Sequence, residues 1–475
     1  MNEALAAIVL AAGRGARMRS TRAKVLHELG GEPLIRRSLR AFAQLKPNYL
    51  VAVVGHQANA VEREVRESFP NQPLCFALQT EQRGTGHAVR CALDELPRNF
   101  AGRILIGYGD MPMLTAASLD AFIDATRGAA LSFITMRVEN PAGYGRVMRD
   151  RVGTVTRIVE ERDATEAERH ITEVNTGIYA VEVDFLCKAV GELRPNNAQG
   201  ELYLTDIVEF ARARGVAIEA RLAADAAEFA GVNSREELAQ MESALREQIN
   251  RRWMAAGVTF IDPATAYIGP EVKLGADSTI GPNVQILGKS EIGSNVVIEG
   301  TAWLSDVIVG EHCHLKIGVR AERCEIGPDS EIGPFANLRE GTRLEGHNRI
   351  GNFVETKQAH IGRGTKASHL SYLGDAIIGA GTNVGCGVIT VNYDGYDKHQ
   401  TRIGARCMVG CDTQLIAPVT VGDDVYVASG TTILRDVADG ALVVSEHPQR
   451  DKPGWTAKWH QRHAGHPKAS AHKAK

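Results

Sequence analysis

The second half of the chain repeats an apolar residue at every sixth position. Three unbroken runs keep this spacing: Ile268, Leu274, Ile280, Ile286, Ile292, Ile298 and Leu304; Ile326, Ile332, Leu338, Leu344 and Ile350; and Ile403, Val409, Leu415, Val421, Val427 and Ile433. A period of six is neither the period of about 3.6 residues of a helix nor the alternation of a simple strand, so it indicates a sequence repeat. Each hexad predicts one short strand and a turn. Three hexads close one triangular coil, with the apolar residues stacked inside.

The first half, up to about residue 233, alternates short β-like apolar runs with amphipathic segments. The apolar runs are Ala7–Leu10, Leu50–Val54, Leu74–Leu78 and Ile104–Ile106. This alternation predicts an α/β domain with a mostly parallel sheet covered by helices. Such domains bind ligands beyond the carboxyl ends of their strands, so we expect the chemistry of this half in the loops that follow them.

A helix is predicted between the two halves. Ser234 and Glu237 have the spacing of a capping box, and an apolar stripe follows at Leu238, Met241, Leu245 and Ile249. The chain therefore divides into a domain over 1–233, a linker helix over 234–252, a coiled domain over 253–450 and a poorly ordered tail over 451–475.

Composition excludes some classes of partner. A formal net charge of −3 with 23% charged residues gives no global attraction to nucleic acid or to an anionic membrane. No stretch reaches the roughly 20 apolar residues that span a bilayer, and Glu3 stands where a signal peptide would be basic. The eight cysteines form no CxxC pair and no disulfide-framework spacing. We therefore expect a cytoplasmic protein with reduced thiols and with neither a nucleic-acid nor a membrane partner.

The loop after the first apolar run carries glycines and cations. Gly13 and Gly15 allow the backbone to turn tightly and approach a phosphate, and Arg17 and Lys24 add positive charge beside it. A glycine-rich turn alone is weak evidence, because this one lacks the GK[ST] of a P-loop. The alternative interpretation is a basic turn exposed to solvent.

Other strand-end loops carry polar residues as well. Asp110 follows the apolar run at Ile104–Ile106, where a carboxylate beside a phosphate loop suits Mg²⁺. Asp110 can instead be the N-cap of the helix that follows Pro112. Glu160 and Asn175 are polar residues on a second edge, where they can hydrogen-bond sugar hydroxyls, although each alone is typical of a turn.

The hexad spacing breaks most clearly at residues 391–401, a polar insertion between two regular stretches. Insertions that leave a repeat core intact are often its functional parts. Polar residues outside the apolar ladder gather just before it: Arg339, Glu355, Lys357, His369 and Tyr372. Acetyl transfer to an amine needs a base, for which His is suited near neutral pH, and cations to hold an anionic acceptor. A lone His is more often structural.

Three resemblances connect these observations. The hexads resemble the left-handed parallel β-helix of hexapeptide acyltransferases, and the string LAAGRGARM…KVL resembles the signature of sugar-1-phosphate nucleotidyltransferases, whose domain is Rossmann-like. In both halves and in order, residues 5 to about 450 resemble the bacterial bifunctional enzymes with N-acetylglucosamine-1-phosphate uridyltransferase and glucosamine-1-phosphate N-acetyltransferase activities. The resemblance implies a homotrimer that acetylates glucosamine-1-phosphate with acetyl-CoA and then couples the product to UTP with Mg²⁺. The UDP-N-acetylglucosamine formed feeds cell-wall precursors.

The same resemblance assigns residues of the first half. It implies catalytic roles for Arg17 and Lys24, and a metal site at Asp110 and Asn233. It implies that UTP and the sugar nucleotide contact Leu10, Ala11, Ala12, Gly13, Lys24, Gln79, Gly84, Thr85, Tyr108, Gly109, Asp110, Gly145, Glu160, Asn175 and Asn233. Gln79 with Gly84 and Thr85 would read the uracil.

In the second half, the resemblance implies that His369 is the acetyl-transfer base and that Glu355 orients it. The sugar-phosphate contacts would be Arg339, Lys357, Tyr372 and Asn383, and the acetyl-CoA contacts Cys386, Asn392, Tyr393, Cys411, Ser429 and Glu446. Cys386, Cys411 and Ser429 stand where the family has Ala, Ser and Ala, and Glu446 where an Arg usually meets the CoA phosphate. We expect that phosphate to lie in solvent here, because a carboxylate would repel it.

Two other functions are considered. The β-helix can be an oligomerising module attached to a nucleotidyltransferase, in which case the set of His369, Lys357, Asn392 and Tyr393 has no purpose. The chain can also be a nucleotide-sugar sensor, which turnover of UTP would exclude.

Overall fold

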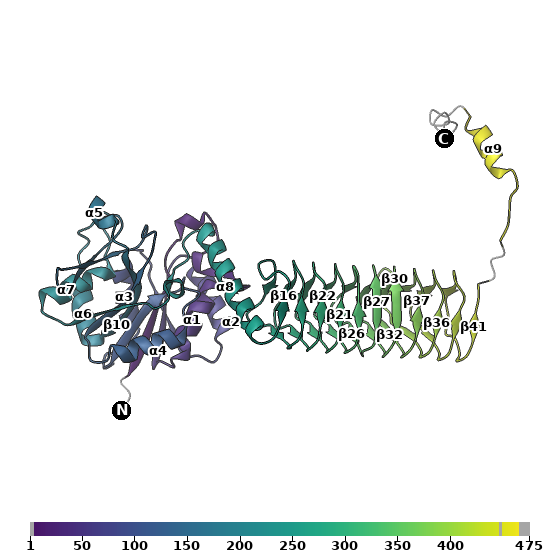
Figure 1. The fold of residues 1–475 in the computed structure, drawn as a ribbon, viewed down its shortest axis with the longest axis horizontal. Helices are drawn as coiled ribbons and strands as arrows, with labels where there is room; N and C mark the ends of the chain where they lie inside the picture. Colours follow the sequence, from purple (N-terminus) through teal and green to yellow (C-terminus); the bar gives the residue numbers. More distant parts are fainter. Residues whose placement is uncertain (1–3, 446–448, 465–475) are drawn as a thin grey trace. The chain divides into compact units, whose positions relative to one another are not determined.

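The computed structural model describes residues 4–445 and 449–464 of the 475-residue chain. The chain divides into two compact units, Met1–Arg252 with Ile268–Pro270 and Trp253–Tyr267 with Glu271–Lys475. Figure 1 shows the fold and labels some of the helices and strands.

The first unit is built on a nine-stranded sheet whose main order is β11-β7-β10-β6-β1-β4-β5, with β8 paired to β10 and β9 paired to β8. The strands are β1 (Leu5–Leu10), β4 (Tyr49–Val54), β5 (Leu74–Leu78), β6 (Arg103–Tyr108), β7 (Leu131–Arg137), β8 (Arg146–Arg149), β9 (Val155–Val159), β10 (Glu173–Glu182) and β11 (Ile218–Leu222). Strand β1 runs parallel to β4 and β6, and β4 runs parallel to β5. The four apolar runs of the sequence are therefore parallel strands, as predicted. Strand β10 makes the sheet mixed, because it runs antiparallel to β6 and β7.

Helices cover both faces of this sheet. The helices that pack on it are α1 (Leu34–Gln44), α2 (Ala58–Ser68), α3 (Thr85–Leu93), α4 (Ala116–Ala125), α6 (Val183–Glu192) and α7 (Ile207–Ala213). The other elements are the helices α5 (Glu166–Arg169) and α8 (Arg235–Ala255) and a small hairpin of β2 (Glu28–Leu29) and β3 (Glu32–Pro33). Successive residues of a strand face opposite sides, so Ile8 of β1 packs in one apolar cluster with α3, α6 and α7. Val9 packs in a second cluster with α1, α2 and α4. The sheet thus has a complete core of its own.

The second unit is a coil of three parallel sheets, as the hexads predict (Figure 1). The first coil sheet contains β12 (Thr259–Phe260), β15 (Thr279–Ile280), β18 (Val297–Ile298), β21 (His314–Leu315), β24 (Glu331–Ile332), β27 (Arg349–Asn352), β30 (Lys366–His369), β33 (Asn383–Val384), β36 (Met408–Val409), β39 (Tyr426–Val427) and β41 (Leu442–Val443). The second coil sheet contains β13 (Tyr267–Ile268), β16 (Gln285–Leu287), β19 (Trp303–Ser305), β22 (Arg320–Glu322), β25 (Asn337–Leu338), β28 (Glu355–Lys357), β31 (Tyr372–Gly374), β34 (Ile389–Val391), β37 (Gln414–Ile416) and β40 (Thr432–Ile433). The third coil sheet contains β14 (Lys273–Leu274), β17 (Glu291–Ile292), β20 (Ile308–Val309), β23 (Glu325–Ile326), β26 (Arg343–Leu344), β29 (His360–Ile361), β32 (Ala376–Ile378), β35 (Thr401–Ile403) and β38 (Val419–Val421).

The ladder residues of the sequence point into this coil. Ile280, Leu304, Ile350 and Val409 have no exposed surface, and every residue of the three runs is buried. Strands of two to four residues suffice because each pairs with its counterparts in the coils before and after it.

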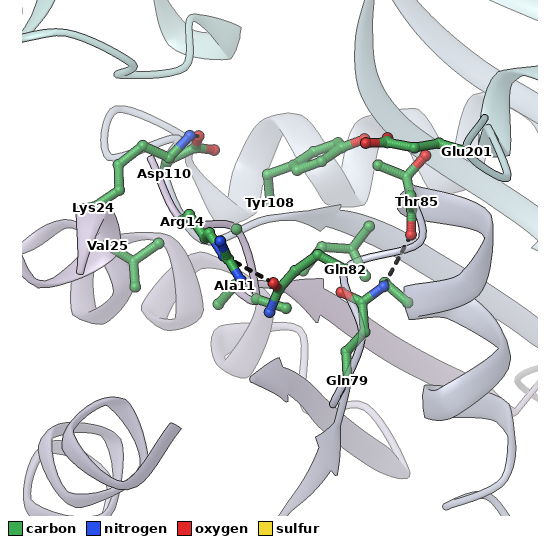
Figure 2. A pocket seen from close by; sticks show the side chains of 15 residues that line it. Ala11, Arg14, Lys24, Val25, Gln79, Gln82, Thr85, Tyr108, Asp110 and Glu201 are labelled. Atoms are coloured by element: carbon green, nitrogen blue, oxygen red, sulfur yellow. Dashed lines mark hydrogen bonds and ion pairs between the residues drawn. The ribbon is translucent and has the colours of Figure 1, made fainter. Parts of the chain in front are cut away.

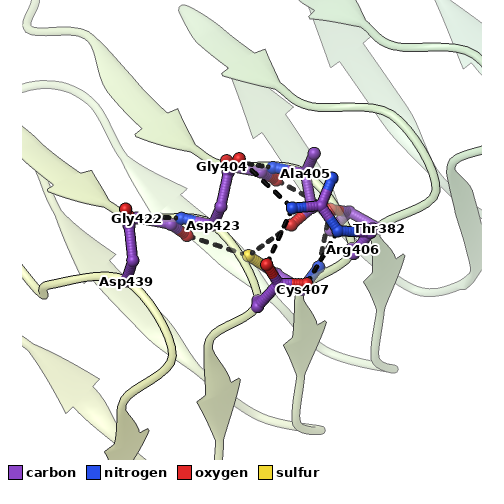
Figure 3. A network of polar contacts seen from close by, with 9 residues as sticks. Thr382, Gly404, Ala405, Arg406, Cys407, Gly422, Asp423 and Asp439 are labelled. Carbon is purple, nitrogen blue, oxygen red and sulfur yellow. Dashed lines mark hydrogen bonds and ion pairs between the residues drawn. The ribbon is translucent and has the colours of Figure 1, made fainter.

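Buried polar side chains join successive coils at the corner before the first coil sheet. The hydroxyl of Thr382 donates to the Gly404 carbonyl at 2.8 Å and accepts from the Cys407 amide at 3.1 Å (Figure 3). The Cys407 thiol in turn donates to the Gly422 carbonyl at 3.0 Å. Because these side chains satisfy backbone groups that the corner leaves unpaired, they can be buried without penalty.

Two features of the C-terminal part complete the fold. Within residues 451–475, where we predicted poor order, Trp455–Arg462 forms the short helix α9. Glu446 and residues 465–475 lie outside the described residues. No helix within 4–445 or 449–464 combines the length and the apolar character needed to cross a membrane.

Candidate active sites

A cavity of about 610 Å³ opens where β1, β5 and β6 end, the edge at which we expected the chemistry (Figure 2). Its lining comprises Leu10, Ala11, Ala12, Gly13, Arg14, Lys24, Val25, Gln79, Gln82, Gly84, Thr85, Ala88, Tyr108, Asp110 and Glu201. Ten residues predicted to contact UTP are among them: Leu10, Ala11, Ala12, Gly13, Lys24, Gln79, Gly84, Thr85, Tyr108 and Asp110. The structure thus brings loops from three strands to one concave surface.

The glycine-rich loop has the local geometry that its glycines predict. Gly15 adopts φ 62°, and a Cβ there would lie 2.5 Å from Lys24 Cβ, so a larger residue would displace the lysine. A Cβ on Gly13 would meet nothing within 4 Å, because Gly13 borders the open cavity. The loop therefore leaves room for a ligand and fixes the start of the Lys24 side chain.

Lys24, Asp110 and Asn233 converge from three distant segments. The Lys24 ammonium pairs with Asp110 Oδ2 and donates to Asn233 Oδ1 at 3.0 Å. The Lys24 and Asp110 side chains are only 15% and 12% exposed. The predicted metal residues Asp110 and Asn233 are therefore neighbours, and the phosphate-loop lysine lies between their oxygens. The N-cap alternative for Asp110 is not supported, because Thr115 caps α4 through the Ser118 amide.

This oxygen set suits a hard cation such as Mg²⁺, which prefers one or two carboxylates completed by phosphate oxygens. One carboxylate and one amide oxygen are a weak site without such a phosphate. Consistent with this, no group of three or more His, Cys, Asp or Glu side chains arranged for a metal occurs in the described part of the chain.

The predicted base-reading residues form a separate wall of the cavity. Gln79 is buried, and its Nε2 donates to the Gly84 carbonyl at 3.0 Å. Gly84 has φ 98°, and a Cβ on it would lie 2.5 Å from the Leu202 carbonyl oxygen. Thr85 begins α3 and its Oγ1 accepts from the Leu204 amide at 2.9 Å. These contacts hold the wall rigid.

Glu160, Asn175 and Gly145 lie together but outside the lining of this cavity. A Cβ on Gly145 would come within 3.5 Å of both Glu160 carboxylate oxygens. Burial raises the pKa of Glu160, although Thr205 donates to its Oε1 at 2.9 Å. Burial also raises the pKa of Tyr108, and the nearby Glu160 carboxylate adds to that effect. Asn175 donates to the Tyr179 hydroxyl at 2.7 Å. These residues form a preformed polar cluster next to Tyr108, which itself lines the cavity.

Some predictions and observations differ at this site. Arg17 is exposed and does not line the cavity. Arg14, Gln82 and Glu201 do line it, but none of the three was assigned a contact from the sequence, although Arg14 lies inside the glycine-rich string and Glu201 belongs to a polar cluster expected to face the sugar. Arg14 Nε donates to Gln82 Oε1 at 3.1 Å across the mouth (Figure 2).

In the β-helix, the parallel register brings together three of the four predicted sugar-phosphate residues, Arg339, Lys357 and Tyr372. Glu355 pairs with Tyr372, and the pairing of Leu338 with Thr356 puts Arg339 beside Lys357 on the second coil sheet. Arg339 Nη1 donates to Glu355 Oε1 at 2.8 Å. Asn383 lies instead on the first coil sheet, where its Nδ2 contacts Met408 Sδ at 3.2 Å.

His369 is exposed at the end of β30, at the corner that leads to the second coil sheet. None of the described residues forms a hydrogen bond with its imidazole. Glu355, predicted to orient His369, is bound to Arg339 instead. The structure therefore places the predicted base and acceptor-binding cations on adjoining surfaces without a direct carboxylate–histidine contact.

The insertion at 391–401 folds back on itself through the pairing of Tyr393 with Lys398. Asn392 is buried, and its Nδ2 donates to Asp375 Oδ2 at 2.5 Å. Tyr393 is 56% exposed. Lys398, which sequence reasoning missed, approaches Lys357 closely enough to lower the pKa of that ammonium. The insertion thus adds a cation beside Arg339 and Lys357.

Three predicted acetyl-CoA residues stack in one column with His369. Asn352 pairs with His369, and the pairings of Ala367 with Val384, Val384 with Val409 and Val409 with Val427 extend the alignment. We call the aligned residues the His369 column: Asn352, His369, Cys386, Cys411 and Ser429. Glu446, the other predicted acetyl-CoA residue near this end, lies outside the described residues.

Comparison with known proteins finds relatives for both halves of the chain. The family of MobA-like NTP transferase domains matches residues 7–173, and the six-repeat bacterial transferase hexapeptide family matches residues 400–435. Three proteins called bifunctional protein GlmU are similar over nearly the whole chain. That of Pelobacter propionicus is 46% identical over 456 residues, which cover 95% of this chain and 98% of the relative. That of Trichlorobacter lovleyi is 45% identical over 455 residues (95% and 98%), and that of Corynebacterium efficiens 43% identical over 457 residues (95% and 94%).

Proposed function

The chain belongs to the family of the bifunctional protein GlmU, and we propose how its two sites divide the work of that family. The enzyme makes UDP-N-acetylglucosamine from glucosamine-1-phosphate, acetyl-CoA and UTP in two transfers. The observation that supports this division is that the two sets of predicted residues lie on different units, one around the cavity of the first unit and the other on the β-helix. Glucosamine-1-phosphate, acetyl-CoA and UTP are all cytoplasmic metabolites, so we expect the enzyme to act in the cytoplasm.

The cavity of the first unit binds UTP. Gln79, Gly84 and Thr85 meet the uracil, while Lys24 and the amides of the glycine-rich loop hold phosphates. The phosphate oxygen of N-acetylglucosamine-1-phosphate attacks the α-phosphorus of UTP, and pyrophosphate leaves. Phosphoryl chemistry requires mainly positioning and charge, both of which Lys24 supplies from its fixed place.

Asp110 and Asn233 are the residues that would hold Mg²⁺. When bound, the ion neutralises phosphate charge. Glu160 and Asn175 face the sugar, where buried and preformed hydrogen-bonding groups favour hydroxyls over water.

The β-helix carries the acetyl transfer. Arg339, Lys357 and Lys398 concentrate positive charge for the phosphate of glucosamine-1-phosphate. His369 takes a proton from the substrate amine. The neutral amine attacks the thioester carbon and loses its proton to His369 as the new N–C bond forms, and the CoA thiolate leaves and takes up that proton as the thiol.

We further propose that the active form is a homotrimer. An apolar stripe lies beside the His369 column: Phe353 follows Asn352, Leu370 follows His369, and Phe335 holds the equivalent position one coil earlier. These three side chains, Phe335, Phe353 and Leu370, are 49%, 58% and 58% exposed. The Phe335 and Phe353 rings stack at 5.5 Å. An exposed apolar stripe next to a site favours an interface with another copy. Because Asn383 lies on a different sheet from Arg339 and Lys357, its contribution to the same sugar phosphate requires such a copy.

The test is to supply the purified chain with glucosamine-1-phosphate and acetyl-CoA, then with N-acetylglucosamine-1-phosphate and UTP. Both half-reactions are expected. UDP-sugar formation without any acetyl transfer would instead support a β-helix that only oligomerises.

A further inference from the structure

Cys386 and Cys411 are distinct from the other cysteines of the β-helix. Cys313 and Cys407 are buried, and their thiols donate to the Gly327 and Gly422 carbonyls, so each links two successive coils at the corner. Figure 3 shows this contact for Cys407. Cys411 is exposed and Cys386 is half-buried. Neither of these two thiols hydrogen-bonds to a residue that the structure describes. A structural role of the kind that Cys407 has is therefore absent at both positions.

The register places the two thiols in successive coils of the His369 column. Val384 pairs with Val409, and two residues further on the Asp412 amide donates to the Cys386 carbonyl at 2.7 Å, so the backbones remain paired through the cysteines. Paired strands lie about 4.8 Å apart. Disulfides join Cα atoms about 4.4–6.8 Å apart, so this spacing permits a bridge without movement of the coil.

The same column connects the thiols to the acetyl site. His369 lies one coil before Cys386 in the register. The thioester sulfur must come close to the base during transfer, because the attacking amine lies between them. Acetyl-CoA therefore passes beside Cys386, and a covalent change there alters the wall on which it binds.

From this we infer that Cys386 and Cys411 form an oxidant-reactive thiol pair that switches off acetyl transfer. The inference rests on the proposed acetyl site. A peroxide is the oxidant: one thiolate attacks a peroxide oxygen, giving a sulfenic acid and hydroxide or, once protonated, water. The second thiol then attacks that sulfur and releases another water. Two thiols are thus oxidised to one disulfide while the peroxide is reduced, and a dithiol reverses the change by exchange.

The experiment treats the reduced full chain with hydrogen peroxide, removes the excess and measures both half-reactions. Acetyl transfer is expected to fall at least about tenfold and to recover with a dithiol reductant, whereas uridyl transfer on the same chain is unchanged. Peptide mapping is expected to show the 386–411 cross-link. For Cys386→Ala, Cys411→Ser and the double variant, acetyl-transfer activity is measured before and after peroxide treatment. In each variant the treatment should change that activity by no more than about twofold. Cys75→Ser, at an exposed thiol of the other unit, should remain as sensitive as the parent chain.

Loss of acetyl transfer by the double variant to the same degree as by the parent chain would overturn the inference. So would a complete 386–411 cross-link without loss of activity, or oxidation that never links these residues. If the reduced chain does not acetylate at all, the proposed acetyl site has failed; peptide mapping still decides whether the thiols pair.

Discussion

Replacing Asp110 by Asn removes one negative charge and nearly preserves the size of the side chain. Asp110 pairs with Lys24 and belongs to the proposed Mg²⁺ site, so the substitution tests both roles. Lys24 would keep an oxygen acceptor but lose its counterion. The proposed UTP-phosphate site would also lose a carboxylate, the one that pairs with Lys24 in the described structure.

The structure sets the size of the effect. Breaking a buried ion pair by removing one partner costs about 3–5 kcal/mol. Because these side chains retain 15% and 12% exposure and Asn still accepts a hydrogen bond, we expect about 2–3 kcal/mol of lost stability in the first unit. Uridyl transfer should fall about 10²–10³-fold, as when one preorganised charge-stabilising group is removed.

The assay measures pyrophosphate release against Mg²⁺ concentration for the parent chain, Asp110→Asn and Lys24→Met. Asp110→Asn should need more Mg²⁺ for half-maximal rate, whereas Lys24→Met should lose rate without that shift. Asp120→Asn, an exposed carboxylate of α4, is the matched control and should behave as the parent chain. Acetyl transfer reports the integrity of the other unit. Near-normal, Mg²⁺-dependent uridyl transfer by Asp110→Asn would refute the metal assignment.

Three further predictions address the second unit. His369→Ala should lower acetyl transfer about 10²–10⁴-fold and leave uridyl transfer unchanged; equal loss of both activities would indicate misfolding instead. A fragment from about residue 251 onward should trimerise and acetylate in gel filtration and activity assays, because the coil buries its own ladder; a monomeric, fully active fragment would argue against shared sites. Thr382→Val should destabilise the coil by about 1–3 kcal/mol, since the Gly404 carbonyl and Cys407 amide lose their partner. Denaturant unfolding followed by tryptophan fluorescence measures this loss, because the four tryptophans, Trp253, Trp303, Trp455 and Trp459, all lie in the second unit. The control is Thr420→Val, at an exposed position of β38. Equal unfolding midpoints for the two variants would disprove the stabilising role of Thr382 at the corner.

The fold was more predictable than the sites because it repeats. The period of six can be read directly from apolar residues such as Ile280, Ile286 and Ile292, and each of them is buried, as that period predicts. The mixed part of the first sheet was missed, since β10 owes its antiparallel place to partners that are distant in sequence. Helix α9 was missed for a different reason: the C-terminal segment that contains it is rich in charged residues and has no apolar periodicity.

The candidate sites depend on contacts that sequence spacing does not contain. Asn233 reaches Lys24 across 209 positions, and only the family resemblance suggested that they share a site. Glu355 pairs with Arg339 and not with His369 because the register of the coils places Glu355 near Arg339. This register could not be predicted from the sequence where a coil departs from three equal hexads. Lys398 escaped notice because the insertion must fold back before its ammonium meets Lys357.

The central claim is that one chain performs both transfers at two independent sites. Its most direct test gives glucosamine-1-phosphate, acetyl-CoA and UTP together to the parent chain, to Lys24→Ala and to His369→Ala, and identifies the products by mass. The parent chain should form UDP-N-acetylglucosamine, Lys24→Ala should accumulate N-acetylglucosamine-1-phosphate, and His369→Ala should form the UDP-sugar only when N-acetylglucosamine-1-phosphate is supplied. A variant that loses both reactions while remaining folded, or a parent chain that never acetylates, would contradict the claim.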